Sequence, residues 1–201
     1  YAINSNGWPE GVLVQDNDCP NLKGLRTYFA WVQGTDHVYI GNQVKDSYQS
    51  HVLRLAGGDR ILIANNDLTN DPLTNGIRGV LTLHSGSYTY VTGNKLSDSP
   101  IGLGPLDKGA GLDHKESRLS WSVVENNVLN ETQINVVHGT EHIMIRNNVF
   151  TDTSRSPIEV EGWDDTYDRG VSDVRVYDNI ALARTSARLL ELLDGFVRTA
   201  S

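Results

Sequence analysis

Three stretches of eight residues share one pattern: ILIANNDL at 61–68, SVVENNVL at 122–129 and IMIRNNVF at 143–150. Each has an apolar residue at its third position, an asparagine three positions later and a second apolar residue two positions after that. Alternation of apolar with other residues over a few positions favours a short β-strand with one buried face. The pattern therefore predicts the same strand, turn and strand at three places in the chain.

Weaker copies of the pattern extend over most of the sequence. The asparagines that mark the copies are Asn17, Asn42, Asn66, Asn94, Asn127, Asn148 and Asn179. Successive subtraction gives intervals of 25, 24, 28, 33, 21 and 31 residues, and such periods are typical of stacked repeats with loops of variable length. Asparagine tolerates the left-handed backbone region and bonds to its own turn. We therefore expect a column of asparagines at one repeated turn, with hydrogen bonds between stacked amides.

A second predicted strand precedes each turn and ends next to a glycine in most copies. These strands lie at 52–55, 81–84, 101–104, 136–138 and 158–161. The segment 187–195 (ARLLELLDG) has helical spacing of its leucines, but Leu190 and Leu192 match Leu53 and Leu55 in their distance from the preceding asparagine. We therefore interpret it as one more strand.

The Φ-x-Φ-x-x-N-x-Φ signatures, where Φ is apolar, resemble those of the pectate-lyase-like superfamily. The resemblance implies an all-β fold, a right-handed parallel β-helix: a solenoid of about seven coils, with the asparagine column at one turn and loop insertions. It covers nearly the whole chain, so residues 1–201 are expected to form a single domain, interpreted as a segment of a longer β-helix protein.

This superfamily contains polysaccharide lyases, uronate epimerases, glycoside hydrolases, tailspikes and adhesins. The resemblance therefore implies a carbohydrate partner and an extracellular, periplasmic or cell-envelope location, and it leaves the activity open. We expect β-elimination or C5 epimerisation on an anionic, uronate-containing polysaccharide. The alternatives are a non-catalytic carbohydrate-binding, adhesive or tailspike-like protein and a glycoside hydrolase.

Composition narrows the classes of partner. The chain has 17 basic and 25 acidic residues, a net charge of −8, without a basic run that would neutralise a row of phosphates. We therefore expect no nucleic-acid partner. No apolar stretch is long enough to predict a membrane span, and the oligomeric state is left open.

Candidate catalytic residues follow from the chemistry of uronates. Removal of the proton next to a sugar carboxylate needs a base of suitable pKa and a cation that holds the carboxylate. His84 and His138 each precede the next asparagine by ten residues, so the alignment places both beside the glycine strand 101–104, at a notch of bare backbone. We predict one of them as the base. The predicted carboxylate-binding cations are Arg54, Lys108, Lys115 and Arg118.

The longest interruption of the pattern, 105–120, follows this notch and also contains His114. Long loops on a rigid scaffold often carry function. Trp31 belongs to the same outward column as Arg54, and we predict both Trp31 and His114 to bind substrate. A glycosidase needs two facing carboxylates, and Glu159 and Glu161 are the candidate pair. If the protein is not a glycosidase, we predict that these two residues bind substrate.

The second loop, 162–173, combines aromatic and acidic residues. Trp163 and Tyr167 are predicted to stack on a sugar ring. Clustered carboxylates are ligands for Ca²⁺, and the resemblance implies that Ca²⁺ assists some members. The candidate calcium ligands are Asp164, Asp165 and Asp168.

Overall fold

The computed structural model describes residues 3–4, 9–22, 28–47, 51–70, 79–105, 118–153, 156–161, 170–183 and 190–193. All of its regular elements are β-strands, and all of the pairings between them are parallel. The all-β prediction is confirmed. No helix in the described ranges is long and apolar enough to cross a membrane.

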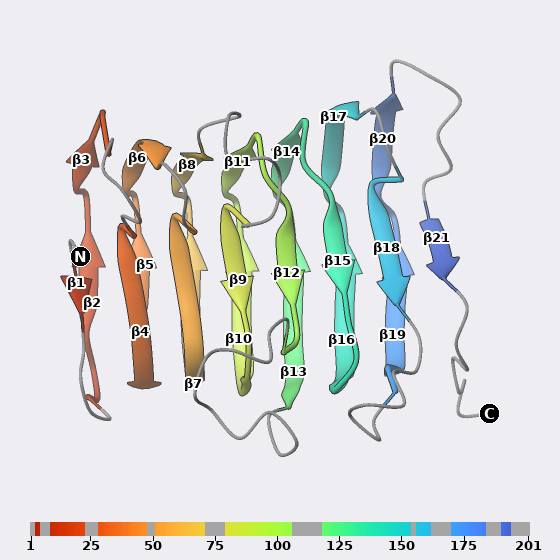
Figure 1. Ribbon diagram of the computed structural model, residues 1–201, viewed down its shortest axis with the longest axis horizontal. Helices are drawn as coiled ribbons and strands as arrows, with labels where there is room; N and C mark the ends of the chain where they lie inside the picture. The colour runs from red at the N-terminus through yellow and green to blue at the C-terminus, as the bar shows by residue number, and fades with distance from the viewer. Residues whose placement is uncertain are drawn as a thin grey trace.

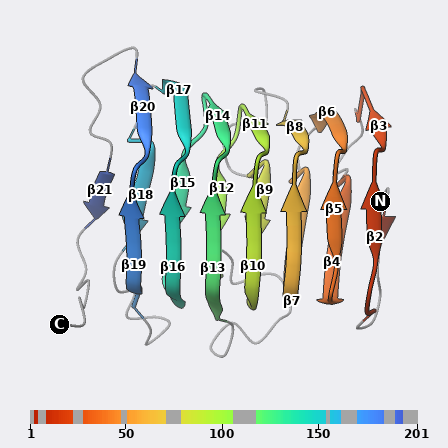
Figure 2. The same cartoon turned by 180° about the vertical axis from the view of Figure 1, so that it is seen from behind.

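One sheet has 14 strands and is curled around strand β7 (Leu53–Ala64). One arm continues from β7 through β9 (Leu81–Leu83), β12 (Ile101–Leu103), β15 (Ile134–Val136), β18 (Ile158–Glu161) and β21 (Leu190–Leu193). We call it the first arm, and Figure 1 shows its strands in front. The second arm continues from β7 through β10 (Gly86–Thr92), β13 (Leu119–Glu125), β16 (Thr140–Arg146) and β19 (Ser172–Tyr177), and Figure 2 shows it in front.

Four short strands complete the curled sheet near the N-terminus. They are β1 (Ile3–Asn4), β2 (Leu13–Gln15), β4 (Ala30–Thr35) and β5 (Val38–Ile40). A separate sheet of seven parallel strands lies along the upper edge in Figure 1. Its members are β3 (Asp18–Cys19), β6 (Gln43–Ser47), β8 (Asp67–Asn70), β11 (Lys95–Ser97), β14 (Val128–Asn130), β17 (Val149–Thr153) and β20 (Ile180–Ala183).

The prediction of a right-handed β-helix of about seven coils is wrong. The described strands form a curled sheet, resembling half a barrel, and a second parallel sheet, without a clear single solenoid. The reason lies in β7, whose twelve residues continue through the corner where the sequence predicted separate strands. Gly57 and Gly58 lie at that corner and pair with Gln33 and Gly34 of β4 after a shift in register that skips Ala56, so the pairing continues past the corner and the two strand stacks join.

The core lies between the two arms and the seven-stranded sheet. The predicted anchors Ile61, Ile63, Ile143 and Ile145 are at most 2% exposed. So are the apolar residues that follow the turns, Leu68, Leu96, Leu129 and Phe150. Strand β21 pairs with β18 through Leu190 and Ile158, which confirms the interpretation of segment 187–195 as containing a strand.

The asparagine column is present at the turn between the curled sheet and the second sheet. Nδ2 of Asn42 donates to Oδ1 of Asn66 at 2.9 Å, and Asn66 donates in the same way to Asn94 at 2.9 Å. The series runs from Asn17 to Asn179 without a break. The predicted hydrogen bonds between stacked amides are therefore confirmed.

Candidate functional site

Six polar and aromatic side chains gather on the outer face of the curled sheet, on or next to β4, β7 and β9. The residues are Tyr28, Trp31, His51, Arg54, Thr82 and His84, and we call them the outer-face cluster. Their position follows from strand alternation: Leu53 and Leu55 of β7 are buried in the core, so Arg54 between them faces outward. Arg54 is paired with Trp31 of β4 on one side and with Thr82 of β9 on the other.

The guanidinium of Arg54 is held by two aromatic side chains. Its Cζ lies 5.6 Å from the centre of the Trp31 ring, which is within the range of a cation–π interaction. Nη1 donates to the hydroxyl of Tyr28 at 3.4 Å, and the Tyr28 and Trp31 rings are stacked with centres 6.0 Å apart. These contacts fix the direction of a fork that is suited to a carboxylate.

Two imidazoles adjoin this cation. The His51 ring is stacked on Tyr28 with centres 6.0 Å apart, and its Nδ1 is hydrogen-bonded to the hydroxyl of Thr82 at 2.7 Å. His84 contacts His51 edge to face at 6.2 Å. Arg54 and Trp31 are partly exposed, whereas Tyr28, His51, Thr82 and His84 are buried. A ligand would therefore meet the cation first, with the imidazoles beneath it.

His138, the other predicted base, does not have the position that the sequence alignment predicted. His138 follows β15, and β12 lies between β15 and β9, so His84 and His138 flank one strand as expected. The predicted register is nevertheless wrong by one residue. Leu103 pairs with Val136, which brings Val137 rather than His138 beside Gly104.

The predicted notch at the glycine strand is also absent. Gly102 and Gly104 are buried, and a Cβ added to Gly104 would lie 2.9 Å from side-chain atoms of both Thr140 and Val137. The space that the missing side chains leave is therefore filled by neighbours. The candidate site lies two strands away, around Arg54.

The remaining predicted site residues fall outside the cluster or outside the described residues. Arg118 lies before β13 and pairs with Glu141 at 3.5 Å. Glu159 and Glu161 lie on β18, three strands beyond β9, and Glu159 accepts a hydrogen bond from Gln133 at 3.3 Å. The predicted residues outside the described ranges are Lys108, His114, Lys115, Trp163, Asp164, Asp165, Tyr167 and Asp168. Within the described ranges, no three His, Cys, Asp or Glu side chains form a metal-binding group.

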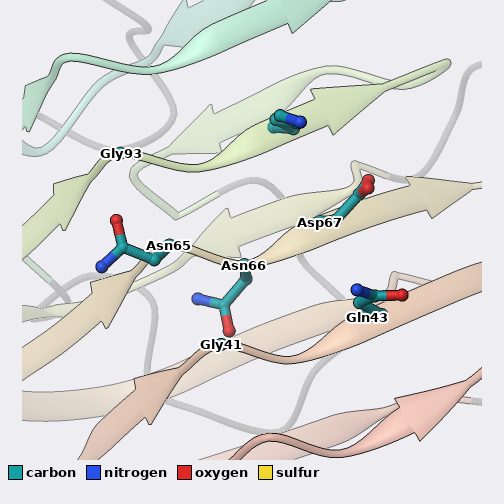
Figure 3. Close-up of a pocket in the computed structure, with 7 residues that line it drawn as sticks. Gly41, Gln43, Asn65, Asn66, Asp67 and Gly93 are labelled. Carbon is teal, nitrogen blue, oxygen red and sulfur yellow. The ribbon is translucent and has the colours of Figure 1, made fainter.

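A shallow polar pocket of about 210 Å³ lies elsewhere, at the asparagine turn (Figure 3). Its lining includes Gln43, Asn65, Asn66, Asp67 and Lys95, between Gly41 and Gly93. The side chain of Asn66 is occupied by the amide column, donating to Tyr39 O and Asn94 Oδ1 and accepting from Asn42. The pocket contains neither an imidazole nor an aromatic ring, so the outer-face cluster is the stronger candidate.

Of the outer-face cluster, Arg54, Trp31 and His84 were among the site residues predicted from the sequence, and their roles remain predictions; Tyr28 and His51 were not among them. A signal was present: Tyr28 precedes Trp31 by three residues, as His51 precedes Arg54. The alignment of β4 with β7 therefore stacks Tyr28 against His51. Both side chains lie just before the strands that the pattern marked.

Fold and site together define an all-β protein of parallel sheets with a cationic, imidazole-bearing cluster on the outer face of the curled sheet. No protein-family model matches the chain, and no curated protein matches it. Among solved structures, the chain is similar to an alginate lyase from a Paenibacillus species, with 16% sequence identity and a TM-score of 0.47. That match covers 97% of this chain and 76% of the other.

Proposed function

We propose that the protein is a polysaccharide lyase that cleaves a uronate-containing polysaccharide at the outer-face cluster. The observation that carries the proposal is the contact of Arg54 with Tyr28 and Trp31 beside the His51–His84 pair. β-Elimination of a uronate needs a group that binds the carboxylate, a base and an acid, and a cation, an imidazole and a phenol of this cluster can supply them. The proposal rests on these residues alone.

In this proposal Arg54 binds the sugar carboxylate and stabilises the negative charge that develops when the adjacent C5–H bond breaks. An imidazole of the His51–His84 pair accepts that proton. The electron pair forms a double bond between C4 and C5, and the C4–O bond to the preceding sugar breaks. The Tyr28 hydroxyl gives its proton to the leaving oxygen, so that charge and atoms balance.

Two alternatives predict different products. A C5 epimerase would return a proton to the other face of the same carbon, which leaves the chain uncleaved. A glycosidase would need paired carboxylates, and the outer-face cluster contains none, while Glu159 and Glu161 lie together on a single strand, β18. The geometry therefore favours proton abstraction over acid-catalysed hydrolysis.

The test is the ultraviolet absorbance of the unsaturated uronate product, measured with alginate, pectate and glycosaminoglycans. We expect absorbance to rise with at least one of them, and Arg54→Ala to lower kcat/KM by roughly 10²- to 10³-fold, as for loss of a group that stabilises transition-state charge. Arg60→Ala is the matched control, because Arg60 is on the same strand but pairs with Asp36, which lies between β4 and β5. Equal activity of both variants would contradict the proposed site.

Additional variants and assays in this experiment test the catalytic base, the calcium site and the alternative functions. His51→Ala and His84→Ala identify which imidazole accepts the proton, and His138→Ala tests the base predicted outside the cluster. Assays with added Ca²⁺ and with a chelator test the proposed calcium site at Asp164, Asp165 and Asp168. Deuterium uptake at C5 without absorbance would indicate an epimerase. Carbohydrate binding with neither signal would indicate a non-catalytic protein. We further propose that the protein acts outside the cytoplasm, where such polysaccharides occur.

A further inference from the structure

A second surface with the chemistry of a binding site lies on the second arm, away from the outer-face cluster. Two rows of side chains cross the same four strands, β10, β13, β16 and β19, which lie side by side in Figure 2. The first row is Tyr88, Trp121, His142 and Asp173. The second row consists of Glu125, Arg146 and Tyr177, which are in register, and of Tyr90, which pairs with Val123 and reaches Glu125 diagonally through its hydroxyl. We call the two rows together the aromatic face.

The first row presents two large rings to solvent. Tyr88 is 60% exposed and Trp121 is 54% exposed. The Trp121 ring is stacked on the His142 imidazole, with centres 4.0 Å apart and planes at 21°. Nδ1 of His142 is in turn 2.7 Å from Oδ2 of Asp173. The indole is therefore held in one orientation without being covered.

The backbone of this row has an uncommon conformation. Tyr88, Trp121 and His142 have φ angles of 57°, 51° and 55°, and the left-handed region is costly for bulky residues. Asp173, the last member of the row, and Arg60 and Asp36, which continue the row beyond Tyr88, have positive φ as well. The bend is thus shared by every strand that the row crosses, whereas exposed aromatic rings in this row are confined to β10 and β13.

The second row fixes two more aromatic rings. The Tyr90 hydroxyl donates to Glu125, and Arg146 donates to the same carboxylate. Nη1 of Arg146 also donates to the Tyr177 hydroxyl at 3.0 Å, with its Cζ 5.9 Å from the centre of that ring. Tyr90 and Tyr177 are 38% and 37% exposed, so this row is ordered before any ligand arrives, which lowers the entropic cost of binding.

Charge complementarity indicates the kind of ligand. The charges of the aromatic face are paired: Glu125 with Arg146 within it, and Asp173 with Arg175 beside it, while His142 is hydrogen-bonded to the same aspartate. An anionic chain would meet no unpaired cation there among the described residues. Flat apolar rings bordered by satisfied polar groups suit a ligand that has apolar faces and hydroxyl groups but no net charge.

We propose that the aromatic face binds an uncharged glycan, lying across the strands over Trp121 and Tyr88. Four parallel strands span about 14 Å between the outer two, which is long enough for several sugar units. Affinity is therefore expected to increase with the length of the oligosaccharide. The site is separate from the proposed catalytic cluster and serves to hold the protein on a neutral polysaccharide.

Binding is tested by isothermal titration calorimetry and intrinsic tryptophan fluorescence, with a soluble β-glucan, a mannan and oligosaccharides of each as probes and alginate as the anionic comparison. Trp121→Ala is expected to weaken binding of a neutral glycan roughly tenfold or more, as for removal of a central aromatic anchor. Tyr88→Ser tests the second exposed ring of the first row in the same way. Leu182→Ala, which removes a 59% exposed apolar side chain from the other sheet, is the matched control and should bind normally.

Three results would overturn the proposal: no binding of any neutral glycan, equal binding by Trp121→Ala and wild type, or binding of alginate alone through Trp121. Self-association in sedimentation experiments that Trp121→Ala abolishes would assign the face to a second copy of the chain instead. Arg54→Ala should keep full glycan binding while losing lyase activity. The test of glycan binding therefore remains valid if the proposed lyase function fails. The test of lyase activity likewise remains valid if the glycan does not bind.

Discussion

Nδ2 of Asn127 lies 3.0 Å from Oδ1 of Asn148, and the backbone N–H of Asn127 donates to the same oxygen at 3.1 Å. One amide oxygen thus accepts two bonds from the neighbouring turn, and both asparagines are fully buried. The arrangement repeats along the column, so each asparagine between Asn42 and Asn148 links three successive turns. Removal of one member should leave buried groups unsatisfied on both sides.

Asn127→Ala is expected to destabilise the protein by about 3 kcal/mol or more, since unsatisfied buried polar groups cost about 1–3 kcal/mol each. The backbone N–H of Asn94 loses its side-chain acceptor, Nδ2 of Asn94 loses one of its three acceptors, and Oδ1 of Asn148 and the carbonyl of Val91 each lose a donor. Urea unfolding followed by circular dichroism measures the change. Asn126→Gly is the matched control: Asn126 has φ of 56°, and the equivalent turn position is glycine at Gly41 and Gly93. A cost for Asn127→Ala no larger than that of the control would refute a stabilising role for the column.

The asparagine column was predicted from the sequence, but the positive φ angle was assigned to the wrong residue of each turn. The asparagines were expected in the left-handed region, yet the positive φ angles belong to the residue before each of them, such as Asn65 at 54° and Asn147 at 53°. Both positions are often asparagine, so composition alone could not separate the residue that bends from the residue that bonds. Only the paired hydrogen bonds show the division.

A similar ambiguity explains the misplaced histidine. Val136, Val137 and His138 look like the end of an apolar strand, and this resemblance aligned His138 with His84. The strand in fact spans Ile134–Val136, with Asn135 facing outward as Arg54 does. The alternation was strong enough to place Arg54 and Trp31 on the outward side of their strands, because their neighbours are buried leucine, valine and alanine. Around 134–138 the alternation of buried and exposed residues was too weak to fix the register, because four of the five residues are buried.

The curl of the sheet was not predictable from local pattern. It depends on β7 continuing through Gly57 and Gly58, and a pair of glycines equally well ends a strand. Whether they end it depends on hydrogen-bond partners supplied by β4 and β10, which are distant in sequence.

Gly86→Ala should be strongly destabilising. Gly86 has φ of 122°, and an added Cβ would lie 1.8 Å from the backbone oxygen of Gly58. The backbone of β7 would have to move, and the pairing of Gly86 with Gly58 would be lost. Gly11→Ala is the control: φ is 70°, but no atom lies within 4 Å of the added Cβ, so it should cost only about 1–3 kcal/mol of backbone strain. Thermal unfolding compares the two variants. Equal melting temperatures would show that the structure moves the Gly58 oxygen away from the added Cβ at little cost.

Acid should weaken the link between β13 and β16 before general unfolding. The Tyr90 hydroxyl, and then Arg146, lower the pKa of Glu125 below its ordinary value of 4.5. A lowered native pKa means that the unfolded chain binds the proton first, so this stabilisation is complete above about pH 4.5 and is lost as pH falls through the native pKa.

The free energy of unfolding of Glu125→Gln should therefore fall less steeply than that of wild type below pH 4.5. Tyr90→Phe removes the leading cause of the shift while it keeps the carboxyl group, and an intermediate slope is expected. Urea titrations at a series of pH values measure both slopes. Identical slopes in all three proteins would show that Glu125 binds its proton equally in the native and unfolded states.

Tyr28→Phe separates the proposed acid from its structural role. Phenylalanine keeps the ring contacts with Trp31 and His51 and removes only the hydroxyl that accepts a hydrogen bond from Arg54. If Tyr28 protonates the leaving oxygen, kcat should fall by roughly 10²- to 10⁴-fold, while KM changes little because Arg54 still binds the carboxylate. Substrates with a leaving group that needs no proton should recover most of the rate in this variant. If kcat is unchanged and only KM rises, the hydroxyl orients Arg54 and the proton comes from another group.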